Sequence, residues 1–266
     1  MVATDTAFAG SIPEYYHRCL GPFLFEPYAE DLARRAQALA PRRILETAAG
    51  TGIVTAALAR ALPEAEIVAT DLNADMLRVA AANLASARVT FTPADAQALP
   101  FPDSGFDLVV CQFGAMFFPD RVGAYREARR VLRPGGALLF NVWDRLDSNP
   151  ASEAIAQAVA ALFADDPPGF ISRVPFGYHD RARIESDLRA AGFESVEAET
   201  VGKRSRGSPR DLAPGLCQGS PLRSEIEARA PERLDEATEA AVAALVRRCG
   251  DPVDCAMSAH VLMARD

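Results

Sequence analysis

Short apolar runs alternate with segments of helical periodicity between residues 42 and 144. Such alternation is typical of βαβ units, in which helices connect the strands of a parallel sheet. The apolar runs predict strands at residues 44–48, 67–71, 89–92, 108–113 and 137–143. The intervening periodicity predicts helices at residues 51–61, 74–84 and 120–132. The first half of the chain therefore has the pattern of an α/β domain.

The rhythm changes after Trp143. An alanine-rich helical pattern at 151–163 and a loop at 165–169 come first, and a helix at 181–191 and a strand at 195–201 follow. A second interruption, containing a helix at 234–248, precedes a final apolar strand at 256–264. We therefore expect an N-terminal helical segment at 1–40, a core formed by 41–145 and 180–266, and insertions at 146–179 and 207–252 that together form a cap.

Composition and charge narrow the possible partners. The chain has 266 residues and is 49% hydrophobic, enough to bury a full core, and its net charge of -8 gives no general attraction to nucleic acid. The basic cluster of Lys203, Arg204 and Arg206 has the pattern of a solvated strand end. No apolar run reaches the ~20 residues of a membrane span, and the first residues lack the pattern of a secretory signal. We expect a cytoplasmic protein without a membrane or nucleic-acid partner.

The five cysteines are scattered along the chain among apolar or small residues. This distribution favours reduced thiols, as in cytosolic proteins. The chain has only three histidines, no pair of cysteines separated by two residues, and no His-Glu-x-x-His motif. We therefore expect no metal site.

The strongest chemical signal is the run from Ile44 to Gly52, in which a strand leads into a turn of small residues and then into a helix. Such a turn lets the backbone approach a ligand closely, and the helix start offers free N–H groups. The same turn can also serve only to pack helix on sheet. Asp71, at the end of the second strand, is placed to accept hydrogen bonds from a ribose diol, although Asp71 or Asn73 could equally cap the next helix.

Two further positions follow the third and fourth strands. Asp95 and Ala96 add a carboxylate and a backbone amide, and Gln112 and Phe113 stand at the next strand end. Because the carboxyl ends of parallel strands meet at one edge of the sheet, these residues are expected to lie near the turn and Asp71. A polar turn over core aromatics is the alternative for Gln112 and Phe113.

The ordered set of these residues resembles class I S-adenosylmethionine-dependent methyltransferases, in particular the branch of ubiquinone and menaquinone biosynthesis. The resemblance covers roughly residues 40–145 and includes two further runs, 102–107 and 132–136. It implies a doubly wound, Rossmann-like sheet of seven strands with an antiparallel last strand. The chain departs from the family pattern at Ala48 and Ala49, where the family often has glycine, or cysteine in the second position.

The resemblance also implies S-adenosyl-L-methionine as cofactor and assigns roles to residues. Residues 48–52 would hold its methionine part, Asp71 its ribose, Asp95 and Ala96 its adenine, and Gln112 and Phe113 would lie near its sulfonium. In related enzymes an N-terminal segment folds over the cofactor, which favours Tyr16, with Tyr15 as the alternate. The predicted cofactor-binding set is therefore Tyr16, Glu46, Ala48, Gly50, Thr51, Asp71, Leu72, Asp95, Ala96, Gln112 and Phe113.

The acceptor of the methyl group is not identified by these motifs, and neither is the oligomeric state. A small-molecule acceptor is expected, in a pocket to which the insertions contribute Phe163, Phe170, Phe176 and Leu222. Methyl transfer needs alignment more than acid or base catalysis, and if the acceptor needed a base, His17 and His179 would be the candidates.

Two other functions stay open. A nicotinamide-dependent oxidoreductase would also have a glycine turn and an acid after the second strand. Against it, position 48 is alanine and position 53 is isoleucine, so that the dinucleotide fingerprint is incomplete. The other alternative is a noncatalytic homologue that kept the cofactor-binding fold.

Overall fold

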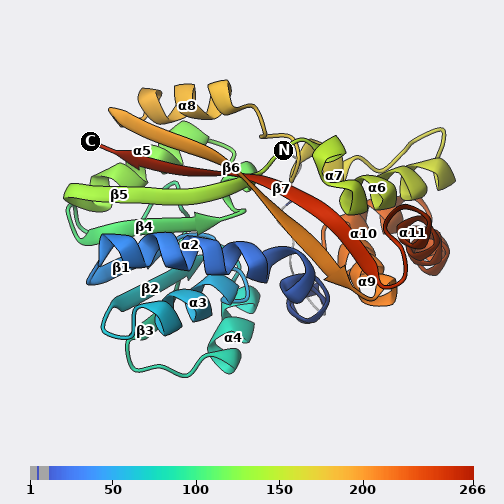
Figure 1. Ribbon diagram of the computed structural model, residues 1–266, viewed down its shortest axis with the longest axis horizontal. Helices are drawn as coiled ribbons and strands as arrows, with labels where there is room; N and C mark the ends of the chain where they lie inside the picture. Colours follow the sequence, from blue (N-terminus) through green and yellow to red (C-terminus); the bar gives the residue numbers. More distant parts are fainter. Residues whose placement is uncertain (1–4, 6–11) are drawn as a thin grey trace.

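The computed structural model describes residue 5 and residues 12–266. Its seven-stranded sheet has the order β3-β2-β1-β4-β5-β7-β6, and only β7 runs antiparallel to its neighbours (Figure 1). The predicted fold class is thereby confirmed. The strands are β1 (Arg43–Glu46), β2 (Glu66–Asp71), β3 (Val89–Pro93), β4 (Phe106–Gln112), β5 (Leu132–Trp143), β6 (Ser195–Gly207) and β7 (Val253–Arg265).

Helices cover both faces of the sheet. In one buried cluster α2 and α3 pack on one face, and in another α5 and α8 pack on the opposite face. The helices are α1 (Ile12–Tyr15), α2 (Glu26–Leu39), α3 (Ile53–Ala61), α4 (Ala74–Asn83), α5 (Arg121–Val131), α6 (Pro150–Leu162), α7 (Phe170–Arg173), α8 (Arg181–Ala190), α9 (Pro209–Gln218), α10 (Leu222–Arg229) and α11 (Leu234–Cys249). A π-helical segment, η2 (Tyr16–Phe25), and short 3-10 turns, η3 (Ala115–Phe117), η4 (Leu146–Ser148) and η5 (Pro231–Arg233), complete the chain.

The central strands are apolar because they are buried on both sides. Ile44 and Leu45 of β1 point to opposite faces, and both are inaccessible to solvent. Ile44 is in register with Ile67 of β2 and Leu108 of β4. Parallel central strands covered by helices on two faces require such continuous apolar runs, which is why the pattern could be recognised in the sequence.

The two predicted insertions form helices that pack on one another. α11 contacts both α6 and α9. Figure 1 shows these helices together with α7 and α10 as a group beyond the ends of β4 and β5. The N-terminal segment predicted at 1–40 is helical from Ile12 onward, and residues 1–4 and 6–11 lie outside the described part.

β6 is longer than expected. The predicted strand ended at residue 201, whereas β6 continues to Gly207 because all of its residues pair with β7. The basic cluster lies in this extension: Arg204 and Arg206 pair with Asp254, and Lys203 lies 3.9 Å from Asp31. The cluster is thus part of a strand end, as predicted, with its charges balanced by neighbouring carboxylates.

The expectation of five reduced cysteines is wrong for one pair. Cys249 and Cys255 form a disulfide across the turn between α11 and β7, and Cys19, Cys111 and Cys217 are free and buried. The two sulfurs meet because the turn brings their Cα atoms within 5.4 Å. The cytoplasmic location, which rested partly on the cysteines, stays a prediction.

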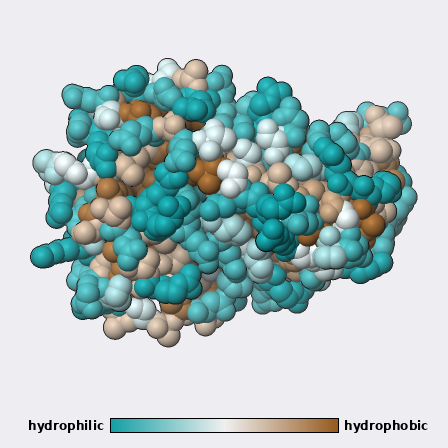
Figure 2. All heavy atoms as spheres, viewed as in Figure 1, coloured by the Kyte–Doolittle hydropathy of each residue, from teal (hydrophilic) through white to brown (hydrophobic). Residues whose placement is uncertain are grey.

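The face of the molecule in Figure 2 is mainly hydrophilic, with apolar residues scattered over the sheet region and the helical group alike. Within the described part of the chain, no helix combines the length and apolar character needed to cross a membrane.

Candidate functional site

The turn after β1 has an unusual backbone conformation. Ala48 and Gly50 both have positive φ, 52° and 56°. The N–H of Ala49 donates to the carbonyl of Thr70 at 2.9 Å, which ties the turn to β2. For Ala48, which has a Cβ, the left-handed conformation costs roughly 1–2 kcal/mol. The alanine that departs from the family's glycine therefore keeps the conformation that glycine would adopt.

Asp71 joins this turn to the end of β2. Its carboxylate accepts the N–H of Gly50 at 2.8 Å and the N–H of Asn73 at 2.8 Å. Burial raises the pKa of Asp71, and these two hydrogen bonds offset the rise in part. Asn73 is the residue that caps α4, by accepting the N–H of Asp75. Asn73, and not Asp71, is therefore the N-cap of α4, which decides between the two capping candidates in the sequence.

Asp95 lies at the end of β3 in a similar loop. Its carboxylate accepts the backbone N–H of Gln97 at 2.8 Å and the Gln97 side chain at 3.1 Å. The N–H of Ala94 donates to the carbonyl of Asp71 at 3.0 Å. The ends of β2 and β3 are therefore fixed to each other by backbone contacts.

Gln112 and Phe113 end β4. Gln112 donates from Nε2 to the carbonyl of Phe25 at 3.3 Å, while its buried Oε1 has no hydrogen-bond partner among the described residues. Phe113 has a φ of 50°, and its N–H donates to Asn141 Oδ1 at 2.9 Å. Its ring stacks on Trp143, with centroids 3.9 Å apart and planes 8° apart. Buried amide oxygens without a donor are uncommon in folded proteins.

These strand ends surround a cavity of about 340 Å³, which lies within the usual range for small-molecule sites. Nine of the eleven predicted cofactor residues line it: Tyr16, Ala48, Gly50, Asp71, Leu72, Asp95, Ala96, Gln112 and Phe113. Sequence reasoning missed the other lining residues, which are Asn73, Met76, Ala94, Gln97, Gly114, Phe117, Phe118 and Pro119. Four of these eight, Asn73, Ala94, Gln97 and Gly114, are immediate neighbours of predicted positions, so the strand-end pattern carried the signal for them.

Glu46 and Thr51 do not line this cavity. Glu46 is buried at the end of β1, and this burial raises the pKa of its carboxyl to about 8. Thr51 lies on the other side of the turn, where its hydroxyl is 3.0 Å from His17 Nδ1. Both residues therefore lie outside the lining of this cavity.

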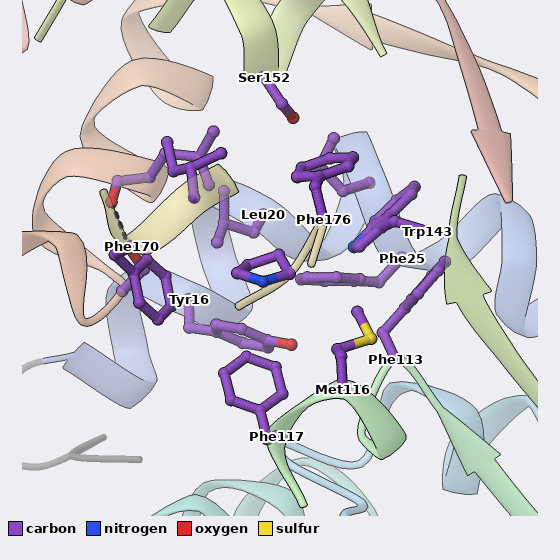
Figure 3. A pocket seen from close by; sticks show the side chains of 15 residues that line it. Tyr16, Leu20, Phe25, Phe113, Met116, Phe117, Trp143, Ser152, Phe170 and Phe176 are labelled. Atoms are coloured by element: carbon purple, nitrogen blue, oxygen red, sulfur yellow. Dashed lines mark hydrogen bonds between the residues drawn. The ribbon is translucent and has the colours of Figure 1, made fainter. Parts of the chain in front are cut away.

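A second, smaller cavity adjoins the first and is almost entirely apolar (Figure 3). The two cavities share Tyr16, Phe113 and Phe117 as lining residues. The rest of its lining comes from η2, η3, the end of β5, the insertion helices and their loops: Leu20, Leu24, Phe25, Met116, Trp143, Ser152, Phe170, Ile171, Pro175, Phe176, Leu216 and Ser220. The small cavity thus lies where the N-terminal segment and both insertions meet.

Aromatic rings form much of this second cavity. Tyr16 stacks on Phe25 with centroids 4.9 Å apart, and Trp143 stacks on Phe176 at 5.8 Å. Burial and the nearby Asp71 carboxylate raise the pKa of Tyr16, so its phenol stays protonated at neutral pH. Phe170 and Phe176 line the cavity as predicted, whereas Phe163 contacts Arg233 and Leu222 is buried in the core, both away from it.

Neither candidate base lies at these cavities. His17 is held between Thr51 and Asn83, and burial lowers its pKa. His179 is bound through Nδ1 to the carbonyl of Phe176 at 2.8 Å. The lining of the smaller cavity includes no Asp, Glu, His, Lys or Arg among the described residues. The expectation that one of these histidines serves as a base has no support in the geometry.

Comparison with known proteins places the chain in a family. Residues 44–136 match a model described as a methyltransferase domain. The ubiquinone/menaquinone biosynthesis C-methyltransferase UbiE of Yersinia enterocolitica is 32% identical over 169 residues, which are 58% of this chain and 67% of that protein. The chain belongs to the class I S-adenosylmethionine-dependent methyltransferases. This chain is also similar to the demethylmenaquinone methyltransferase of Deinococcus radiodurans. The two are 34% identical over 60% of this chain and 66% of that protein.

A solved structure supports the fold over the full length of the methyltransferase. Phosphoethanolamine N-methyltransferase 2 of Haemonchus contortus, in complex with S-adenosyl-L-methionine, superposes with a TM-score of 0.62. The superposition covers all of this chain and 60% of that one, at 17% identity. These relatives are methyltransferases, so the oxidoreductase and the noncatalytic homologue that the glycine turn left open receive no support from them.

Proposed function

We propose that the methyltransferase binds S-adenosylmethionine in the larger cavity and transfers its methyl group to a small, apolar acceptor in the adjoining aromatic cavity. The shared wall of Tyr16, Phe113 and Phe117 is the observation that supports this arrangement best. A donor in one cavity and an acceptor in the other would meet at this wall. Transfer requires only that nucleophile, methyl carbon and sulfur lie in line.

The residues of the larger cavity fit the cofactor. Asp71 has carboxylate lone pairs beyond the two used by backbone N–H groups, and these suit a ribose diol. The turn at Ala48 and Gly50 lets the backbone approach the methionine part, and Gln112 and Phe113 line the same cavity, where they would lie near the sulfonium. Asp95 and Ala96 lie beside Leu72, which is 65% exposed and would cover one face of the adenine.

The cofactor supplies an electrophilic methyl group on a sulfonium. The methyltransferase would position the two reactants and surround the sulfonium with aromatic rings. The Tyr16 ring and the aromatic residues behind it offer π faces that attract a cation. No charged side chain is among the described residues that line the smaller cavity, so a proton that the acceptor loses on methylation would have to pass to solvent. An electron-rich carbon of an uncharged ring suits this lining. The two curated relatives are named for quinone biosynthesis, and an aromatic acceptor agrees with the lining found here.

The insertions at 146–179 and 207–252 act as the cap of the acceptor site in this proposal. They contribute Ser152, Phe170 and Phe176 from one insertion and Leu216 and Ser220 from the other. Together with the N-terminal segment they would separate the reacting atoms from water. This separation strengthens the electrostatic contacts of the transition state.

Calorimetric titration with S-adenosylmethionine tests the cofactor site. Asp71→Asn removes a charged acceptor. We expect about 10- to 100-fold weaker binding, which corresponds to the loss of one or two charge-assisted hydrogen bonds. Asp180→Asn is the matched control, because Asp180 also accepts two backbone N–H groups, at the start of α8 and away from the cavity. Equal affinity of wild type and Asp71→Asn would contradict the assignment of Asp71, and no binding by the wild type would contradict the cofactor site.

A further inference from the structure

The smaller cavity contains one hydroxyl, that of Ser152, for which the described part of the chain provides no hydrogen-bond partner. Ser152 is 94% buried, since its exposed fraction is 6%, and it lines the cavity. In Figure 3 its side chain extends from α6 into the space above Trp143 and Phe176. No hydrogen bond of the Ser152 hydroxyl occurs among residues 5 and 12–266. Its oxygen is not one of the fully enclosed polar atoms without a partner, so it is reachable from the cavity, and a bound molecule with a polar atom would pair with it.

The other serine of the cavity differs in this respect. Ser220 donates its hydroxyl proton to the carbonyl of Leu216 at 2.6 Å and accepts the N–H of Leu222 at 3.2 Å. Its hydrogen-bonding capacity is therefore largely used within the protein. Tyr16 lies at the wall shared with the larger cavity. Ser152 is absent from that wall, so it lies on the side away from the predicted cofactor site.

Ser152 lies in the first turn of α6, where the helix start creates a partial positive charge beside its hydroxyl. It is the third residue of the helix, before the first i→i−4 hydrogen bond, which runs from the N–H of Glu153 to the carbonyl of Asn149. Asn149 does not cap the helix with its side chain, because its amide exchanges hydrogen bonds with the backbone of Ser258. The first turn of α6 therefore keeps its partial positive charge, which favours an atom with lone pairs beside Ser152.

We propose that Ser152 is a specificity-determining residue that donates a hydrogen bond to an oxygen atom of the acceptor, at the end remote from the methylated atom. This inference rests on the proposed function, because it takes the smaller cavity as the acceptor site. The aromatic walls bind the flat, apolar body of the acceptor, and Ser152 fixes its orientation. The acceptor class is thus an uncharged ring system that carries a carbonyl or hydroxyl oxygen opposite its nucleophile.

The only tryptophan of the chain allows a direct test. Trp143 lines the cavity, so its fluorescence reports occupancy. The titration uses protein saturated with S-adenosylhomocysteine, which prevents transfer, and two probes of similar shape: phenol, which has an oxygen, and toluene, which has none. Excitation is set at the red edge of tryptophan absorption, where neither probe absorbs.

Ser152→Ala should raise the dissociation constant of phenol about 3- to 10-fold and leave that of toluene within about twofold of wild type. Ser152→Thr keeps the hydroxyl and should keep the preference for phenol. Ser220→Ala is the matched control, because its hydroxyl is already bound, and should leave the ratio of the two constants unchanged even if both shift.

Three results would overturn parts of this reasoning in distinguishable ways. Equal effects of Ser152→Ala on phenol and toluene would overturn the role of Ser152. Failure of both probes to bind wild type that does bind S-adenosylhomocysteine would overturn the inference and the acceptor cavity, but would leave the cofactor site intact. Failure of the protein to bind S-adenosylhomocysteine would contradict the proposed function itself.

Discussion

The ionisation of Glu46 should make the stability of the methyltransferase depend on pH. Glu46 ends β1 beneath the turn, is 1% exposed, and has one carboxyl oxygen, Oε2, without a hydrogen-bond partner among the described residues. Burial raises its pKa from 4.5 to about 8, and the nearby Asp71 carboxylate adds to the rise. The folded protein therefore holds Glu46 protonated at neutral pH. Glu46→Gln is the perturbation, because the amide has the same shape and does not ionise.

The direction of the effect follows from the two protonation states. Below pH 4.5 the carboxyl is protonated in both the folded and the unfolded chain, and its contribution to stability is complete. Between pH 4.5 and about 8 the unfolded chain ionises while the folded chain keeps the proton, so the free energy of unfolding falls. Each unit of difference between the two pKa values corresponds to about 1.4 kcal/mol, which gives a loss of at most ~5 kcal/mol.

Urea unfolding of the cofactor-free protein measures this loss. The free energy of unfolding of Glu46→Gln minus that of wild type should increase by several kcal/mol between about pH 5 and about pH 8, and then level off. Other titrating groups are common to both proteins and cancel in the difference. Glu66→Gln, an exposed position at the start of β2, is the control and should give a difference that does not vary with pH. A constant difference for Glu46→Gln would refute the raised pKa.

Two other substitutions test the turn and the disulfide. Gly114→Ala would place a Cβ 2.5 Å from the Cβ of Ala48 and 2.8 Å from Sγ of Cys111. The cofactor turn must then shift, and we expect at least ~10-fold weaker binding of S-adenosylmethionine by calorimetry. Unchanged affinity would show that the turn is not rigid. Cys255→Ser opens the disulfide with Cys249 and should lower the stability of oxidised protein by about 2 kcal/mol. Thermal unfolding with and without reductant checks this, since reduced wild type and variant should then melt alike.

The lining of the larger cavity, which we propose as the cofactor site, could largely be predicted because it is local in sequence. The turn at Ala48 and Gly50, Asp71 and Asp95 each follow an apolar strand directly, and parallel topology brings such strand ends together. Orientation within this frame is less predictable from the sequence. Glu46 and Thr51 belong to the same run, but their side chains point away from the cavity, and a one-dimensional pattern does not record on which side of a turn a side chain lies.

Other features depend on partners that are distant in sequence. The extension of β6 to Gly207 is rich in charge and resembles a loop until its pairing with β7 and the neutralising Asp254 are known. Cys249 and Cys255 look unrelated until the turn between α11 and β7 brings them together. Hydrogen bonds between strands and the closure of a disulfide are properties of the folded chain, so a single strand or a single cysteine carries little sign of them.

The acceptor cavity is the extreme case, because its walls come from η2, η3, β5, both insertions and their loops. Phe163, Phe170 and Phe176 have equal apolar character in the sequence, yet only two of them face the cavity, and packing decides which. Ser152 carried no signal at all, since a serine in the first turn of a helix is ordinarily a surface residue. Ser152 becomes buried because α6 packs on α11 of the 207–252 insertion, and this burial underlies its proposed role in binding the acceptor. Substrate choice can therefore change through packing of the insertions while the strand-end residues proposed to hold the cofactor stay the same.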